Sequence, residues 1–217
     1  MNYLEPMADF FTARVEGYDE HMLNDVEGCR EGYERMAGLV PQNTTDLLDL
    51  GCGTGLELDA IFRRLPELKV TGVDMTRSML DKLQEKHPEK SLNLICGDYF
   101  VTEFGTAVYD CCVSFETMHH FTHEKKTELY SRICTALREN GCYIECDYMV
   151  ETQEEEEHWF AENDRIRREQ GIPVDAFYHY DTPCSVENQV KMLHQAGFSR
   201  IEHVFQIGGT HMLIAYK

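Results

Sequence analysis

From residue 46 onward, short apolar runs alternate with stretches in which apolar residues recur every three or four positions. The apolar runs predict five strands, at residues 46–50, 69–73, 93–96, 109–114 and 141–149. The helical period predicts helices between them, at residues 55–65, 78–86 and 123–138. Alternation of this kind is typical of a parallel sheet that carries helices on both faces.

The segments that flank this region have other patterns. Residues 6–39 read as a helix broken near Gly17 and Gly28, and we expect this segment to lie over one edge of the sheet. The C-terminal part predicts a polar helix, a loop, a second helix and two strands, at residues 152–170, 171–185, 185–196, 199–206 and 211–216. The turn IGGT between the last two strands indicates an antiparallel hairpin. The expected fold is therefore α/β, with a mostly parallel, seven-stranded sheet and an antiparallel C-terminal hairpin.

Composition narrows the possible partners. A chain of 217 residues fits one domain, and its formal charge of −19 repels phosphate backbones and anionic lipids. We therefore expect no nucleic acid and no membrane as partners. The sequence has neither a secretory leader nor an apolar run of about 20 residues, so a cytoplasmic location is expected. The nine cysteines are then reduced, and their spacings favour buried structural thiols over a zinc site.

The stretch LLDLGCGTG carries the strongest chemical signal. Gly51, Gly53 and Gly55 follow a strand and open a helix, and they let a ligand approach the bare backbone closely. The next strand ends in Asp74, at the distance where nucleotide-binding folds place an acid against ribose hydroxyls. Together these features predict a loop that binds a nucleotide-type cofactor.

The spacing does not fit the two commonest phosphate-binding loops. In the dinucleotide fingerprint the third glycine stands one residue later, where this chain has Leu56, and no phosphate-binding lysine follows as in a P-loop. The motifs DLGCGTG, GVD and CGDYF instead resemble those of the class I S-adenosylmethionine (SAM)-dependent methyltransferases. The resemblance extends from residue 46 to the end of the chain, and it implies a Rossmann-like, doubly wound sheet with SAM as cofactor and S-adenosylhomocysteine (SAH) as product.

The resemblance also implies roles for the residues of the glycine loop. The backbone of Gly51, Gly53 and Gly55 would surround the amino-acid part of SAM, and Asp49 would face its ammonium group. Asp74 would accept hydrogen bonds from both ribose hydroxyls.

Further cofactor contacts are implied at the ends of the next strands. Met75 would pack on the adenine, and Asp98, with Tyr99 beside it, would bind the adenine amino group. The segment VSFETMHHF matches the fourth-strand motif, so Ser114 and Phe115 would line the sulfur end of the cofactor. Met75 could equally be a core residue, and Asp98 could instead cap a turn.

The broken N-terminal helix is a candidate lid. Arg14 would meet the cofactor carboxylate, and Tyr18 would offer a ring face to the sulfonium, because aromatic rings attract cations. In the simpler alternative the aromatic residues Phe10 and Phe11 pack on the sheet. The expected organisation is a single domain in four parts: the lid, the cofactor-binding core, a substrate-side insertion and a terminal helix with its hairpin, at residues 1–44, 45–150, 151–184 and 185–217.

Catalytic candidates lie where the strands end. His119, His120, Asp147 and His179 are expected near the mouth of the sheet and could act as a base, since histidine titrates near neutral pH. No metal site is predicted, because no third nearby ligand completes a known pattern.

The expected reaction is methyl transfer to a small-molecule acceptor by direct in-line displacement, with a neutral or cationic acceptor favoured by the acidic charge. Three alternatives stay open: transfer of another group or use of a modified cofactor, a non-catalytic SAM-binding protein, and an NAD-dependent dehydrogenase.

Overall fold

Each predicted apolar run forms a strand, with ends shifted by a few residues. The computed structural model describes residues 3–173 and 176–217, so residues 174 and 175 of the expected loop lie outside the described part. The strands are β1 (Asp46–Leu50), β2 (Lys69–Asp74), β3 (Ser91–Cys96), β4 (Tyr109–Phe115), β5 (Leu137–Val150), β6 (Cys184–Ser185), β7 (Arg200–Ile207) and β8 (Thr210–Tyr216). β5 begins four residues before the expected strand, because the preceding helix passes directly into it.

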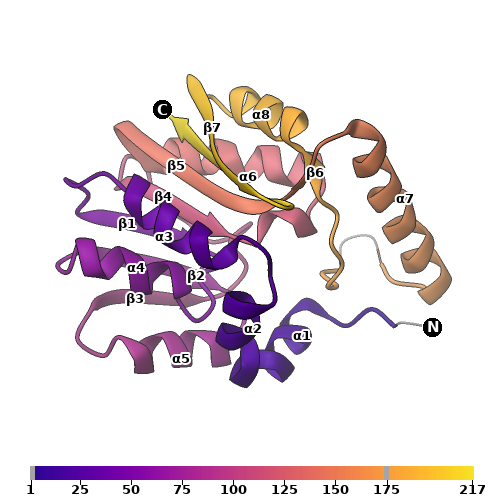
Figure 1. Cartoon of the computed structure of the whole chain (residues 1–217), viewed down its shortest axis with the longest axis horizontal. Coiled ribbons are helices and arrows are strands. Elements are labelled where there is room, and N and C mark those ends of the chain that lie inside the picture. Colours follow the sequence, from indigo (N-terminus) through magenta and orange to yellow (C-terminus); the bar gives the residue numbers. More distant parts are fainter. Residues whose placement is uncertain (1–2, 174–175) are drawn as a thin grey trace.

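The strands form one sheet in the order β3-β2-β1-β4-β5-β8-β7, as Figure 1 shows. The pairs from β3 to β5 are parallel, whereas β8 is antiparallel to β5 and to β7. The expected doubly wound sheet with a C-terminal hairpin is confirmed. The strand count of seven is wrong: the two-residue strand β6 pairs with the end of β5 as an eighth. A run this short directly after Pro183 has no period that a sequence pattern can show.

Helices cover both faces of the sheet. They are α1 (Met7–Arg14), η1 (Val15–Gly17), α2 (Tyr18–Asn24), α3 (Cys29–Leu39), α4 (Leu56–Arg64), α5 (Arg77–Lys86), η2 (Met118–His120), α6 (His123–Ala136), α7 (Gln153–Gln170) and α8 (Val186–Gln195). One core joins α3, α4 and α5 to one face, and a second core joins α6 and α8 to the other. Among the described residues, no helix combines the length and apolarity needed to cross a membrane.

The N-terminal segment is broken near both expected glycines, but it does not cover an edge of the sheet. α3 packs on the face, where Tyr33 stacks on Phe115 of β4 at a centroid distance of 3.9 Å. Burying Tyr33 and Met36 removes far more apolar surface from water there than at an edge. α1 and α2 instead lie at the carboxyl ends of the strands, at the bottom of the view in Figure 1.

The close approach of α3 to the sheet depends on Gly32. A Cβ at this position would lie 2.9 Å from Cζ of Phe115 and 3.3 Å from Sγ of Cys146. We expect Gly32→Ala to lower the free energy of unfolding by about 1–3 kcal/mol through overpacking. The matched control is Gly38→Ala on the same helix, where a Cβ meets nothing within 4 Å. Denaturant unfolding of both variants checks the prediction, which is contradicted if the two behave alike.

Candidate active site

The glycine loop joins β1 to α4 and needs left-handed backbone at three positions. Gly51, Gly53 and Gly55 have φ values of 70°, 47° and 75°, a region that side chains disfavour. The NH of Gly53 donates to Oδ2 of Asp74 at 3.0 Å, which fastens the loop to the end of β2. A Cβ at Gly55 would clash with Cδ1 of Leu83, so this glycine leaves room for the Leu83 side chain of α5 against the start of α4.

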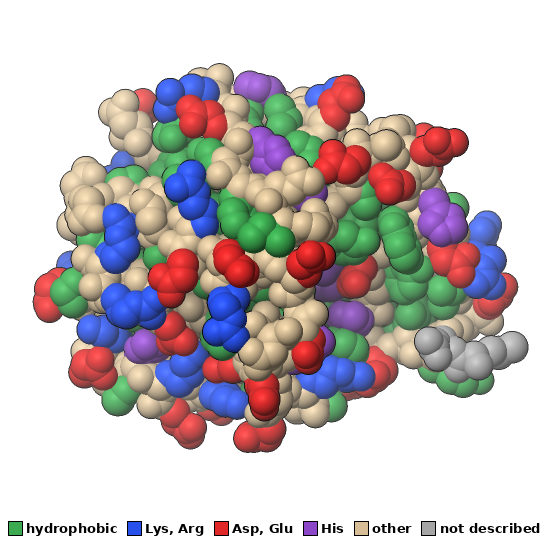
Figure 2. Space-filling model, viewed as in Figure 1, with side chains coloured by type: hydrophobic (Ala, Val, Ile, Leu, Met, Phe, Trp, Pro, Cys, Tyr) green, Lys and Arg blue, Asp and Glu red, His purple; other side chains and the backbone are tan. Residues whose placement is uncertain are grey.

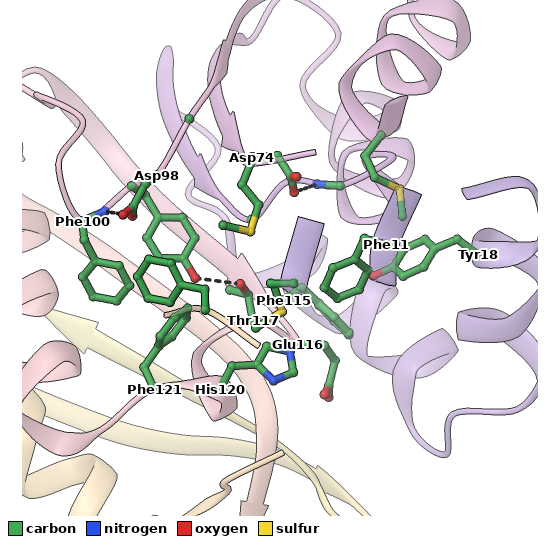
Figure 3. Close-up of a pocket in the computed structure, with 18 residues that line it drawn as sticks. Phe11, Tyr18, Asp74, Asp98, Phe100, Phe115, Glu116, Thr117, His120 and Phe121 are labelled. Atoms are coloured by element: carbon green, nitrogen blue, oxygen red, sulfur yellow. Dashed lines mark hydrogen bonds between the residues drawn. The ribbon is translucent and has the colours of Figure 1, made fainter. Parts of the chain in front are cut away.

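Two cavities open at the carboxyl ends of the strands. The inner pocket is lined by residues that include Gly51, Gly53, Asp74, Met75, Asp98, Tyr99 and Phe115. The outer cavity, of about 740 Å³, is lined by residues that include Phe10, Arg14, His119, Tyr148, His179 and Asp181. Both cavities share Phe11, Tyr18, Glu116 and His120, which we call the junction. Figure 3 shows Asp74 across the inner pocket from Glu116 and His120.

Two carboxylates in the inner pocket are held by backbone donors. Asp74 accepts from the NH groups of Gly53 and Thr76, at 3.0 and 2.7 Å, and burial raises its pKa. Asp98 accepts from the NH of Phe100 at 2.7 Å. Since each carboxylate oxygen has two lone pairs, both side chains keep capacity for a ligand.

Three of the expected cofactor residues do not line either cavity. Gly55 serves helix packing, and Ser114 is fully buried with its hydroxyl 2.6 Å from that of Tyr143. Asp49 is also fully buried beneath the loop, where burial and the adjacent Glu57 raise its pKa well above the usual range.

Residues 7–24 form a strap across both cavities. The strap is bound to the loop after α7 by a bridge between Pro6 and Tyr178 and by the NH of Met7, which donates to the carbonyl of Phe177 at 3.0 Å. Phe10 stacks on His179 with ring centroids 3.5 Å apart. Arg14 lies in the outer cavity, 3.6 Å above the Phe10 ring and paired with Glu5 at 3.0 Å. Phe10 therefore packs on the loop after α7, whereas Arg14 lies outside the inner pocket.

The inner pocket is narrow with the strap in this position. Its volume is about 60 Å³, whereas pockets for small organic ligands hold roughly 300–1,000 Å³. The rings of Phe11 and Tyr18 lie side by side at its edge in Figure 3. Entry of a ligand as large as a nucleoside therefore requires the strap to move outward.

His119 lies among three carboxylates. Its Nδ1 is 2.6 Å from Oδ1 of Asp147 and 3.6 Å from Oε2 of Glu116, and its Nε2 is 3.4 Å from Oδ1 of Asp181. Burial lowers the pKa of His119, but the charges and hydrogen bonds of Asp147 and Asp181 outweigh this and raise it well above the usual value. The raised pKa favours the imidazolium form of His119, in which the ring has no lone pair to act as a base.

His120 has the opposite character. Burial and the positive charge of His119 lower its pKa well below the usual value, so its ring is neutral. Its Nδ1 lies 3.2 Å from the carbonyl oxygen of Tyr180, which can only accept. We therefore assign the proton to Nδ1, which leaves Nε2 as an acceptor on a ring that lines both cavities. His119 and His120 both reach the outer cavity because they lie in a short 3₁₀ turn.

Glu116 is the main site residue that sequence reasoning missed. It directly follows β4 with a φ of 49°, a strained value for a glutamate, and its side chain is 9 % exposed. Burial raises its pKa to about 8, although the charge of His119 opposes this. Asp181 was missed as well. Both residues stand in segments already singled out, VSFETMHHF and FYHYDTP, but no sequence pattern marks either acid.

Two overlapping groups of side chains at the outer cavity have the residue types of metal ligands: Glu116, His119 and Asp147, and His119, His120 and Asp181. A third group, His123, Glu156 and Cys184, lies beneath α7. In that group Nζ of Lys126 lies 3.2 Å from Sγ of Cys184, so the ammonium group of Lys126 already contacts the sulfur where a metal would bind.

Comparison with known proteins agrees with this geometry. Residues 47–141 match the family model described as a methyltransferase domain. A carboxy-S-adenosyl-L-methionine synthase of Campylobacter lari is 25 % identical over 99 % of this chain and 96 % of its own length. The bifunctional biotin biosynthesis protein BioHC of Teredinibacter turnerae is 27 % identical over 72 % of this chain, which covers 27 % of that protein.

Solved structures share the fold at low identity. An O-methyltransferase family protein from Burkholderia thailandensis superposes with a TM-score of 0.73 at 15 % identity over 98 % of this chain. Human N-acetylserotonin methyltransferase in complex with SAM gives a TM-score of 0.67 at 15 % identity over 97 % of this chain. The chain spans only 64 % and 60 % of the lengths of these two structures.

The Rossmann-like fold, the matched methyltransferase domain and the relatives make the chain similar to the class I SAM-dependent methyltransferases. The matched domain and the SAM-using relatives support an enzyme that is a SAM-dependent methyltransferase, with SAM as cofactor and SAH as product.

Proposed function

We propose that this enzyme transfers the methyl group of SAM to a small-molecule acceptor that binds in the outer cavity. The observation that carries the proposal is the junction: the inner pocket and the outer cavity meet at Phe11, Tyr18, Glu116 and His120. A cofactor in one cavity can thus face an acceptor in the other, which is the geometry that in-line displacement requires.

The residues of the inner pocket fit SAM. Bare backbone at Gly51 and Gly53 suits the amino-acid part, and Asp74 keeps lone pairs for the ribose hydroxyls. Asp98 is placed for the adenine amino group, with Met75 and Tyr99 against the ring. The aromatic rings of Tyr18 and Phe115 suit the sulfonium end. We assign Asp49, Gly55 and Ser114 no direct contact.

SAM supplies an electrophilic methyl group, so the protein needs no nucleophile of its own. The strap and the junction rings exclude water, and His120 Nε2 can accept a hydrogen bond from the acceptor. His119 and Asp147 hold the turn that presents His120. His179, whose pKa burial lowers, supports the strap by stacking on Phe10.

The relatives named carboxy-SAM synthase raise a second candidate, a reaction that alters the cofactor itself. A carboxylate on the cofactor methyl would need a cation at the junction. The junction instead carries the acid Glu116, and the nearby Arg14 is paired with Glu5. The charge of the site therefore favours methyl transfer.

Ligand binding and mass spectrometry test the proposal together. At one hundred times its dissociation constant, SAH should raise the free energy of unfolding by about 2.7 kcal/mol, measured as a shift in melting temperature. A purified sample should carry SAM or SAH of unmodified mass. A cofactor heavier by one carbon dioxide would support the second candidate, and the lack of any shift with SAM or SAH would refute both.

A further inference from the structure

We propose that the acceptor is an organic amine, bound in its ammonium form in the outer cavity and deprotonated by Glu116. This inference rests on the proposed methyl transfer and adds the chemical class of the acceptor and a second catalytic residue. It stands on the charge of the outer cavity, the environment of Glu116 and the aromatic lining.

The first observation is the charge of the outer cavity. Glu116 and Asp181 line it, and Figure 2 shows histidine and acidic side chains together in a hollow of this face. Two cationic side chains of the cavity are already paired with acids. His119 pairs with Asp147 and Asp181, and Arg14 pairs with Glu5. Because burial keeps His120 and His179 neutral, they add no positive charge. The cavity therefore favours a cation over an anion.

The second observation is that Glu116 lacks a close donor. Its Oε1 lies 3.4 Å from the hydroxyl of Thr210, and its Oε2 lies 3.6 Å from Nδ1 of His119, which is committed to Asp147 at 2.6 Å. These distances exceed those of charge-assisted hydrogen bonds. A carboxyl that is held in strained backbone and almost fully buried would gain a full hydrogen bond from an ammonium group.

The third observation is the aromatic surface around this carboxyl. Phe11 and Tyr18 lie at the junction, and Phe10 and Tyr148 line the outer cavity. Ring faces attract ammonium groups, whereas they give no such gain to an alcohol or a carboxylate. Rings and carboxyl together form a site for a cation with an apolar body.

The position of Glu116 also provides an acceptor for the proton that the ammonium group must lose before methyl transfer. An ammonium nitrogen has no lone pair, so one N–H proton must first pass to the carboxylate of Glu116. The freed nitrogen pair then forms the N–C bond as the C–S bond breaks, and the sulfur keeps the electron pair as the thioether of SAH. His120 Nε2 accepts a remaining N–H and directs the lone pair. The product is a methylated ammonium, and each turnover releases one proton from Glu116 to water.

In the empty cavity burial raises the pKa of Glu116 to about 8. An ammonium group beside it lowers this pKa again, because an opposite charge favours the carboxylate form that accepts the proton. His120 is the weaker base of the two, since its pKa is lowered.

The test compares matched ligands on the enzyme saturated with SAH. Isothermal titration is performed with phenethylamine, phenethyl alcohol and 3-phenylpropionate, followed by a panel of small aliphatic and aromatic amines. At least one amine should bind, and about tenfold or more tighter than its matched alcohol and acid. Tighter binding of the alcohol or the acid, or failure of every amine, would overturn the proposal.

A variant pair assigns the effect to Glu116. Glu116→Gln should weaken amine binding about tenfold and leave alcohol binding within about twofold, because only the amine loses a charged partner. Glu85→Gln, at an exposed position on α5 that lines neither cavity, is the matched control and should change neither. Equal amine binding by Glu116→Gln would refute the role of this residue.

Two further measurements separate the possible failures. SAH binding is measured first, because its absence refutes the proposed function, whereas SAH binding without amine binding refutes only the amine acceptor. Titration with Zn²⁺ and Mn²⁺ follows, since Glu116, His119 and Asp147 could hold a metal. Tight metal binding that blocks the amine would overturn the proposal in favour of a metal site.

Discussion

Asp74→Ala is expected to weaken SAH binding at least about a hundredfold. The substitution removes the acceptor of two backbone NH groups, those of Gly53 and Thr76, and the proposed acceptor of the ribose hydroxyls. A hydrogen bond to a charged group contributes about 1.5–3 kcal/mol, so the loss of two reaches a hundredfold in affinity. Isothermal titration with SAH measures the effect directly.

The control for this variant is Asp81→Ala. Asp81 is an exposed residue of α5 whose carboxylate lies 4.0 Å from the guanidinium of Arg77, so SAH affinity should stay within about twofold of the parent. Comparable affinity in the two variants would contradict the assignment of the inner pocket to the cofactor. Asp74→Asn should give an intermediate loss, because a single amide oxygen can replace only one carboxylate acceptor.

The ligand-free enzyme is expected to lose stability as the pH rises from 6.5 to 8.5. Three buried glutamates, Glu57, Glu116 and Glu145, have pKa values raised by burial to about 7, 8 and 7. In the unfolded chain these groups titrate near 4.3. The folded state therefore holds protons that the unfolded state has already lost, and each such proton lowers the free energy of unfolding as the pH rises toward the folded pKa.

The neighbouring groups do not reverse the sign in this window. Glu116 faces His119 from η2, Asp147 from β5, Asp181 from the loop after α7 and Thr210 from β8. The raised pKa of His119 acts in the same direction, because the folded state again keeps the extra proton. The lowered pKa values of His120 and His179 oppose the trend only below the unfolded histidine value, near 6.5.

Summed over the three glutamates, the loss is on the order of 3 kcal/mol, measured by denaturant unfolding at both pH values in constant salt. Glu116→Gln should remove roughly half of it, since Glu116 has the highest of the three pKa values. Stability that is constant or rises across this window would contradict the burial of these acids.

Much of the fold could be predicted from the sequence because its signals are local. Apolar runs and helical periods are properties of neighbouring residues, and they located β1 to β4, α4 and α5 to within a few residues. The placement of α3 could not be predicted, because an amphipathic pattern gives the buried face of a helix but not the strands that it meets. Its contact with Phe115, made by Tyr33, joins residues 82 positions apart.

Some residues of the candidate site could likewise be predicted from the sequence, whereas others could not. Asp74 and Asp98 follow strands whose carboxyl ends meet at one edge of the sheet, so topology alone brings them together. Glu116 owes its character to burial, and Asp181 owes its own to the histidines of η2 that the loop after α7 brings beside it. This arrangement also raises the pKa of His119 and lowers that of His120, a difference that the sequence of two adjacent histidines cannot show.

The bridge between the strap and the loop after α7 has a kinetic consequence. Pro6 pairs with Tyr178, and the backbones of Glu5 and Met7 bond to His179 and Phe177, so the two segments separate only if these bonds break. The strap lines both cavities, and the loop after α7 lines the inner pocket at Phe177 and the outer cavity at His179 and Asp181. With SAH in the inner pocket as proposed, we therefore expect its exit to disturb both cavities at once and product release to limit turnover.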